Sequence, residues 1–391
     1  MSTNRELPAI SRRAPGEHGS IRGAALALCF FIIITTLAPL AMGQSAWRHK
    51  NIHARYGHST VFDPVSNRMI ILAGQHAKNF PDDFDLWFAV YTPGSTALQM
   101  IPATLATGHP SARFGHTAVL DSTNNRMVIF GGGTGTSTPG PCLNDVWLLQ
   151  NANGVSATPA WTQQRPGGTV PSARFAPTAV YDATTNTMIL FGGYDCSANY
   201  LNDVWILNNA NGLGGTPTWT QLSVGGTVPS GREAATAVYD PTNNVMTIHG
   251  GDVGTAVDGD VWVLSHANGM GGTPTWTQLA PTGPAPAARS GHSAIYDAAN
   301  NRMTVYGGQT SNSVSNLLND FWVLTNANGI GGAPAWTQLT PQTPGAFRSF
   351  HTAVYDAAVN TMLIFGGKTS ISLLPADDHV TVVTQANGLQ P

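Results

Sequence analysis

Four side chains that can transfer protons or bind a cation lie within one short stretch of the chain: Glu233, His249, Asp252 and Asp258. Together they could hold a metal ion, bind sugar hydroxyls or act as general acid and base. Their spacing matches no diagnostic motif, so sequence drift, with His249 as a hydrogen-bonded core histidine, is the competing interpretation. Glu233 and His249 are the candidate catalytic residues, and Asp252 and Asp258 are candidate binding residues.

Arginine recurs six times along the chain at intervals of 57 to 61 residues. These further candidate binding residues are Arg55, Arg113, Arg174, Arg232, Arg289 and Arg348. If the fold gathers them around one axis, six guanidinium groups could bind an anion. They could equally form ion pairs across neighbouring repeats with aspartates that recur in the same phase, which are Asp85, Asp145, Asp203, Asp260 and Asp320.

The composition excludes several classes of protein. Only 10% of the 391 residues are charged and the formal net charge is −3, whereas about a quarter is typical of a globular chain. So few charges exclude a charge-stabilised disordered chain. The isoelectric point of about 6.4 argues against nucleic-acid binding.

The first 43 residues have the three-part pattern of an export segment. Residues 1–23 carry four arginines, residues 24–40 are almost wholly apolar, and Ala41 and Gly43 place small residues before a cut at Gln44. This pattern predicts a signal peptide over residues 1–43 and a periplasmic, extracellular or envelope-associated protein. An uncleaved membrane anchor is the alternative, because residues 24–43 are long enough to cross a bilayer. Membrane contact would then be confined to this segment.

Residues 44–391 consist of one unit repeated six times. Each copy contains four strand-like runs, a to d, which in the second copy are residues 116–120, 127–130 and 145–149 and a run containing Trp161. Strand b is apolar at consecutive positions, so both of its faces must be covered. Short four-stranded sheets covered on both faces predict an all-β fold, a six-bladed β-propeller. The recurring tryptophans and methionines are then blade-packing residues.

The two ends of the chain predict how the ring closes. The sixth copy has strands a, b and c but reaches Pro391 without a strand d, whereas residues 44–48 resemble strand d of the other copies. We therefore expect the N-terminal strand to complete the last blade.

The repeated motifs resemble those of kelch repeats. They are Arg-x-x-His, a Tyr-Asp pair, Gly-Gly, Asn-Asp-Val-Trp and Trp-Thr-Gln-Leu, and they extend over residues 44–391. The resemblance implies a six-bladed propeller with four antiparallel strands in each blade, similar in layout to secreted bacterial kelch proteins and to the galactose oxidase family. That oxidase family needs a copper site with a histidine from an additional C-terminal domain. This chain ends within its sixth blade, so copper oxidation is not expected.

The expected loops predict where the cysteines and the acidic residues lie. In this topology the d–a and b–c loops share one face, and the a–b and c–d loops share the other. Cys142 and Cys196 fall in b–c loops of adjacent blades, and they are the two cysteines that remain after cleavage before Gln44. An even number of cysteines in an oxidising compartment predicts that they pair. The acidic residues outside the repeat pattern fall on the d–a/b–c face: Asp82, Asp83, Asp195, Glu233, Asp252, Asp258, Asp377 and Asp378.

The sequence favours a binding or interaction protein, active as a monomer, with a protein or glycan ligand on the d–a/b–c face. The alternative is a sugar-acting enzyme, an epimerase or isomerase, that uses Glu233 and its neighbours. No cofactor is expected. A calcium site built from oxygen ligands is conceivable where the chain ends meet, although solvated loop charges explain the same residues, Asp82, Asp83, Asp85, Asp377 and Asp378.

Overall fold

The computed structural model describes residues 44–48, 52–76, 84–92, 98–105, 108–135, 140–311, 316–341, 343–369 and 379–389. The signal peptide expected over residues 1–43 lies outside these ranges, as do Asp82, Asp83, Asp377 and Asp378 of the calcium hypothesis. Both therefore stay predictions. Within the described ranges, no helix has the length and apolar character needed to cross a membrane.

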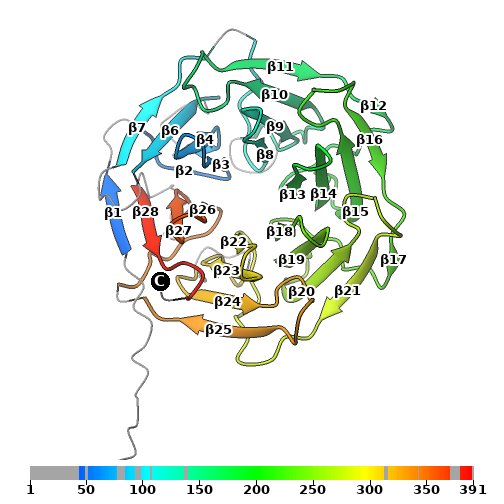
Figure 1. Ribbon diagram of the computed structural model, residues 1–391, viewed down its shortest axis with the longest axis vertical. Coiled ribbons are helices and arrows are strands. Elements are labelled where there is room, and N and C mark those ends of the chain that lie inside the picture. Colours follow the sequence, from blue (N-terminus) through cyan, green and yellow to red (C-terminus); the bar gives the residue numbers. More distant parts are fainter. Residues whose placement is uncertain are drawn as a thin grey trace, which may run out of the picture. The chain divides into compact units, whose positions relative to one another are not determined.

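The described residues form a six-bladed β-propeller, which confirms the predicted fold class (Figure 1). Blade 1 contains β3 (Ser59–Asp63), β4 (Arg68–Leu72), β6 (Leu86–Tyr91) and β7 (Leu98–Pro102). Blade 2 contains β8 (Thr117–Asp121), β9 (Arg126–Phe130), β10 (Val146–Gln150) and β11 (Ala160–Gln164). Blade 3 contains β13 (Thr178–Asp182), β14 (Thr187–Tyr194), β15 (Tyr200–Asn208) and β16 (Thr218–Gln221).

The other half of the ring repeats this order. Blade 4 contains β18 (Thr236–Asp240), β19 (Val245–Asp252), β20 (Val257–Ser265) and β21 (Thr275–Leu279). Blade 5 contains β22 (Ser293–Asp297), β23 (Arg302–Tyr306), β24 (Phe321–Thr325) and β25 (Ala335–Leu339). Blade 6 contains β26 (Thr352–Asp356), β27 (Thr361–Phe365), β28 (His379–Thr384) and β1 (Gln44–Arg48).

The N-terminal strand closes the ring, as the sequence predicts. β1 pairs antiparallel with β28, so that Gln44 lies opposite Val383 and Arg48 lies opposite His379. Figure 1 shows this blue strand beside the red C-terminal strand. Hydrogen bonds between the two ends of the chain therefore complete the sixth blade.

Blades 3 and 4 depart from four antiparallel strands, because each gains a two-residue parallel strand at its outer edge. These additions are β12 (Gly167–Gly168), which pairs with β16, and β17 (Gly225–Gly226), which pairs with β21. Gly168 has φ of 79°, and a Cβ there would overlap with the carbonyl oxygen of Trp219. Only glycine permits the long d–a connection to run so close to the next blade.

The hydrophobic core lies between the blades rather than within one sheet. In the contact region of blades 1 and 2, Ile70 and Leu72 of β4 pack with Met127 and Ile129 of β9. Val61 is 8% exposed there and the other four side chains mentioned are fully buried. The same packing joins blade 6 to blade 1, so the ring is closed by side chains as well as by β1.

The aspartate at the end of each strand a closes the a–b turn. In blade 2, Asp121 Oδ1 accepts a hydrogen bond from the Asn124 backbone amide at 3.1 Å, and Asn125 has φ of 53°. The other oxygen, Asp121 Oδ2, accepts from Asn211 Nδ2 of blade 3 at 2.6 Å. The same bond from an Asn of the repeated Asn-Ala-Asn-Gly loop recurs at the five junctions from blades 1 and 2 to blades 5 and 6, so the loop ties these neighbours together on the a–b/c–d face.

Candidate binding face at the channel mouth

The six repeated arginines are buried, with 0–2% of each residue exposed. Arg174 represents them: its Nη1 and Nη2 atoms donate to the two carboxylate oxygens of Asp203 at 2.7 and 3.0 Å. Its Nη1 also donates to the Gly192 carbonyl at 2.9 Å. The Trp205 indole donates to Asp203 Oδ2 at 2.6 Å, so the Asn-Asp-Val-Trp motif holds its own aspartate in place.

Equivalent ion pairs occur in five blades. They are Arg55–Asp85, Arg113–Asp145, Arg174–Asp203, Arg232–Asp260 and Arg289–Asp320. Each pair lies within one blade and not across two, because the arginine precedes strand a of the sheet whose strand c carries the aspartate. The ion-pair interpretation therefore fits the geometry, except that the pairs do not cross between repeats as expected. The anion-ring interpretation does not fit, since these guanidinium groups are buried and already hydrogen-bonded within their own blades.

Burial and ion pairing act in opposite directions on the aspartates. Burial alone would raise the pKa of Asp203, but the hydrogen bonds and charge of Arg174 and the Trp205 indole outweigh it and lower the pKa. The carboxylate is therefore held ionised. The contact between blades instead involves the arginine backbone, since the Gly132 amide of blade 2 donates to the Arg174 carbonyl at 2.9 Å.

A closed ring of six backbone hydrogen bonds surrounds the channel. Its members lie two residues after each arginine, and each amide donates to the carbonyl of the member in an adjacent blade at 2.6–3.0 Å: Gly57, Gly115, Ala176, Ala234, Gly291 and Phe350. All six have positive φ between 47° and 61°. The sequence analysis missed this ring, although the small residue at five of the six positions was an available signal.

Histidines lie along the channel beside this ring. A cavity of about 210 Å³ on the axis is lined by inner-strand residues together with His58, His116, His292 and His351. A further cavity of about 190 Å³ is lined by the six ring residues and the same histidines. Each imidazole bonds a hydroxyl of an adjacent blade, as His116 Nε2 does with Ser59 Oγ at 2.7 Å. These histidines therefore connect neighbouring blades.

One layer above the ring, a residue following each arginine pairs with a residue following each glycine pair. We call these twelve residues the mouth layer. In chain order the pairs are Tyr56 with Gln75, in β2 (Arg55–Tyr56) and β5 (Gln75–His76), then Phe114 with Gly133, Phe175 with Tyr194, Glu233 with Asp252, Ser290 with Gln309 and Ser349 with Lys368. The layer contains aromatic residues in blades 1–3 and only non-aromatic polar or charged residues in blades 4–6, so the blades differ chemically in this layer.

The b–c hairpins of blades 3 and 4 project beyond this layer. β14 and β19 each have eight residues and β15 and β20 each have nine, whereas strands b and c of the other blades have five or six. A register shift at the glycine pair, between Phe191 and Gly193 in blade 3 and between His249 and Gly251 in blade 4, continues the pairing past the layer. Two ordered hairpins therefore stand on the d–a/b–c face.

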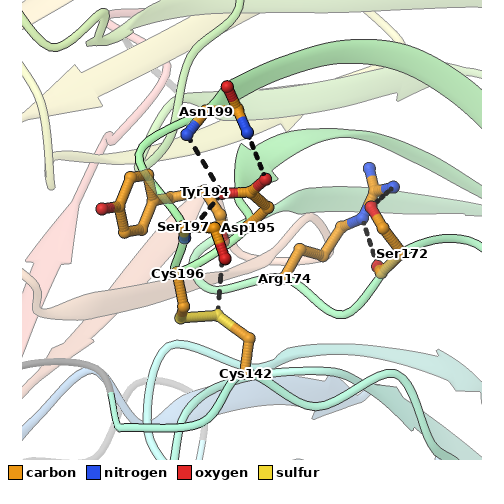
Figure 2. Close-up of a disulfide and its surroundings, with 8 residues drawn as sticks. All are labelled: Cys142, Ser172, Arg174, Tyr194, Asp195, Cys196, Ser197 and Asn199. Carbon is orange, nitrogen blue, oxygen red and sulfur yellow. Dashed lines mark hydrogen bonds between the residues drawn. A yellow bond between two sulfur atoms is a disulfide. The ribbon is translucent and has the colours of Figure 1, made fainter.

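A disulfide joins Cys142 and Cys196, as predicted, and links the b–c loops of blades 2 and 3 (Figure 2). Their Cα atoms are 5.8 Å apart. Beside the bond, Asp195 accepts hydrogen bonds from the Ser197 and Asn199 amides at 2.7 and 3.0 Å. The turn of the blade 3 hairpin is therefore fixed to blade 2 by a covalent bond. The Asp195 carboxylate closes the turn through its hydrogen bonds.

The four polar residues of the fourth copy do not form one site. Glu233 and Asp252 lie side by side through reciprocal backbone hydrogen bonds of 3.0 and 2.8 Å. Burial and the charge of Asp252 raise the pKa of Glu233 to about 8. Asp258 lies 3.5 Å from Arg232 Nη2. His249 is 0% exposed, and burial together with the charge of Arg289 lowers its pKa to about 3.

His249 is sealed between blades 4 and 5. Its Nδ1 lies 3.0 Å from His292 Nε2, and its ring is 5.1 Å from that of Trp336. Phe191 meets Trp276 in the same way one blade earlier, so His249 occupies an ordinary core position. A catalytic pair of Glu233 and His249 at a common cavity is therefore not formed. Within the described ranges, no group of three or more His, Cys, Asp or Glu is arranged to hold a metal ion.

Six blades that repeat the same buried arginine, five of them with its aspartate partner in the same blade, define a repeat propeller in which the periodic residues are structural. The family model for the KLHDC2/KLHL20/DRC7 Kelch-repeats domain matches residues 155–281 and 270–386. The chain belongs to the kelch-repeat family.

Similar proteins combine such repeats with other parts. The chain is 29% identical over 346 residues to an F-box/kelch-repeat protein of Arabidopsis thaliana, covering 82% of this chain and 68% of that protein. It is 26% identical over 271 residues to acyl-CoA-binding domain-containing protein 4 of the same plant (67% and 36%) and 29% identical over 273 residues to host cell factor 1 of Rattus norvegicus (65% and 12%). A propeller of this family fits a protein-interaction role.

Proposed function

We propose that this chain is an exported interaction module that binds a protein partner on its d–a/b–c face. The observation that carries the proposal is the contrast between two neighbouring layers. The arginine layer is buried and nearly identical in every blade, whereas the mouth layer above it differs from blade to blade and bears two projecting hairpins. Variable, ordered loops on a rigid frame suit recognition.

Two further observations support parts of this proposal. A disulfide between b–c loops fits an oxidising compartment, in agreement with the export segment expected from the sequence. One relative, 30% identical over 128 residues, is by name a subunit of the dynein regulatory complex of Chlamydomonas reinhardtii, which favours a protein ligand. A glycan ligand has less support, because most of the tryptophans that could stack on sugars are buried in the blades, and Trp87 and Trp147 are half-buried. The buried ones are Trp161, Trp205, Trp219, Trp262, Trp276, Trp322 and Trp336.

Shortening one hairpin tests the proposal. Asp252 and Val257 face each other across the blade 4 hairpin, so residues 253–256 can be replaced by Asn-Gly, a two-residue turn that keeps the strands paired. We expect the wild-type full chain, immobilised, to capture a specific protein from the exported proteins of its source organism, and the shortened variant to lose it.

The matched control changes the opposite face. Met270 is 48% exposed in the c–d loop of the same blade, and Val155, Leu213 and Ile330 are exposed in corresponding c–d loops. The variant Met270→Asn should capture the partner as the wild type does. Equal capture by the shortened variant, or loss of capture in the Met270→Asn variant alone, would place binding elsewhere and refute the proposal.

A further inference from the structure

Two oxygen atoms at adjacent positions of the mouth layer are buried without a hydrogen-bond partner among the described residues. They are Glu233 Oε2 in blade 4 and Ser290 Oγ in blade 5. Ser290 is only 1% exposed. Elsewhere in the layer, Ser349 Oγ donates to Gln309 Oε1 at 3.1 Å and the Tyr56 hydroxyl bonds Gln75. Buried polar atoms without partners are uncommon, so this pair requires an explanation.

The repeat geometry indicates where the two side chains extend. A Cβ on Gly115 would overlap with the Phe175 ring, and one on Gly57 would lie 3.3 Å from the Phe114 ring. The residue after each arginine therefore extends over the ring residue of the preceding blade. Ser290 has the same backbone pairing, and its neighbour Gly291 donates to the Ala234 carbonyl at 3.0 Å. From this backbone pairing we infer that the Ser290 side chain extends over Ala234, the residue that follows Glu233.

Two tyrosines and a second carboxylate complete a wall around Glu233. The Tyr200 ring lies against the blade 4 hairpin, since a Cβ on Gly254 would come within 2.6 Å of it. Burial, followed by the negative charges of Asp252 and Glu233, raises the pKa of Tyr200 to about 12. The Tyr194 ring centroid lies 5.2 Å from that of Tyr200. Asp252 is 5% exposed and accepts from the Gly254 amide at 2.8 Å. We call Glu233, Asp252, Ser290, Tyr194 and Tyr200 the acidic recess.

No positively charged side chain neutralises this recess within the described ranges. The neighbouring Arg232 is committed to Asp260 at 2.5 Å and approaches Asp258 at 3.5 Å. Glu233 Oε2 and Ser290 Oγ have no hydrogen-bond partner in the described part of the chain. A carboxylate accepts hydrogen bonds only, and a serine hydroxyl can accept as well as donate. A planar guanidinium has several N–H donors and stacks on aromatic rings, so it would satisfy the acceptors and the tyrosine wall together.

We propose that the acidic recess receives an arginine side chain of the partner protein, with Glu233 as the anchoring carboxylate. This inference rests on the proposed function, since it names the chemistry of the partner at that face. In the free protein, Glu233 is largely protonated at pH 7 because its pKa is about 8. An incoming guanidinium stabilises the carboxylate, so the carboxyl proton leaves to solvent as the ion pair forms.

Isothermal titration calorimetry with N-acetylarginine amide tests the recess on the full chain. Titrations at pH 7 in two buffers of different ionisation enthalpy measure the protons released on binding. We expect weak binding with release of most of one proton. The variant Glu233→Gln should weaken binding by about ten- to a hundredfold, the range for a hydrogen bond to a charged group, and should abolish the proton release. N-acetylcitrulline amide, which has nearly the same shape without the charge, should not bind.

Two control variants separate the recess from the face as a whole. Asp195→Asn makes the same replacement of an acid by its amide on the blade 3 hairpin, outside the recess, and should bind as the wild type does. Ser290→Ala should weaken binding severalfold while leaving Glu233 in place, which keeps the test valid if Glu233→Gln fails to fold. Absence of arginine binding, or binding that Glu233→Gln and Ser290→Ala leave unchanged, overturns the inference. Partner capture that depends on the blade 4 hairpin would then still support the proposed function.

Discussion

Replacing Arg174 by methionine is expected to lower the free energy of unfolding by about 3–5 kcal/mol, the cost of leaving a buried charge without its partner. The guanidinium is fully buried and holds Asp203 and the Gly192 carbonyl of the same blade. Methionine keeps much of the aliphatic packing but donates no hydrogen bond. Urea unfolding followed by tryptophan fluorescence measures the difference.

The matched control is Arg165→Met, because Arg165 is exposed in the d–a connection before blade 3. Exposed substitutions usually change stability by less than about 0.5 kcal/mol. If Arg174→Met were as mild as Arg165→Met, the arginine would not be a structural residue. An anion-binding role for the six arginines would then regain support.

Acidification is expected to unfold the propeller because its channel and core histidines are neutral when folded. Burial, followed by the charge of Arg113, lowers the pKa of His116 to about 3, and His249 has a similar value. The pKa values of His58, His292 and His351 are also lowered, with burial as the largest cause. The ordinary value in an unfolded chain is about 6.5.

The sign follows from proton binding. Below pH 6.5 these histidines bind protons in the unfolded chain but stay neutral in the folded chain. Their contribution to the free energy of unfolding is therefore complete above pH 6.5 and decreases toward pH 3. At pH 4.5 the loss is on the order of 3 kcal/mol for each of His116 and His249, from 1.36 kcal/mol per pKa unit. Urea unfolding at pH 7.0, 5.5 and 4.5 measures it. In the variant His116→Ala, which copies Ala235 of blade 4, this pH dependence should be shallower by one proton. Equal stability at pH 7.0 and 4.5 would contradict the account.

The sequence was sufficient to predict the fold because its signals repeat in phase. An arginine, an aspartate and a glycine pair recur about every 58 residues, so an error in one copy is corrected by the others. Residues 44–48, which contain Trp47, resemble strand d of the other copies, and this predicted that they complete blade 6. The pairing of β1 with β28 confirms the prediction. Cys142 and Cys196 were assigned to adjacent b–c loops by the same phase.

The site was less predictable because it depends on contacts between copies. Glu233 is unusual in the sequence, but the lack of a hydrogen-bond partner for its Oε2 atom among the described residues is evident only in the structure. The residues near it, Ser290 and Tyr200, come from two other blades. His249 was a candidate catalytic residue because it replaces the large apolar residue that ends strand b in the other copies. The register nevertheless places it against Trp336 in the core. Backbone angles set the ring that orients the mouth layer, and five small residues gave only a faint indication of it.

Photo-crosslinking from two opposite positions of blade 4 tests the central claim most directly. A photoreactive phenylalanine derivative replaces either Thr255, exposed at the tip of the b–c hairpin, or Met270, exposed in the c–d loop. Each full-chain variant is irradiated with the exported proteins of the source organism, and the adducts are identified by mass spectrometry. The account predicts one recurrent protein adduct from position 255 and none from position 270. Adducts from position 270 without any from position 255 would contradict it.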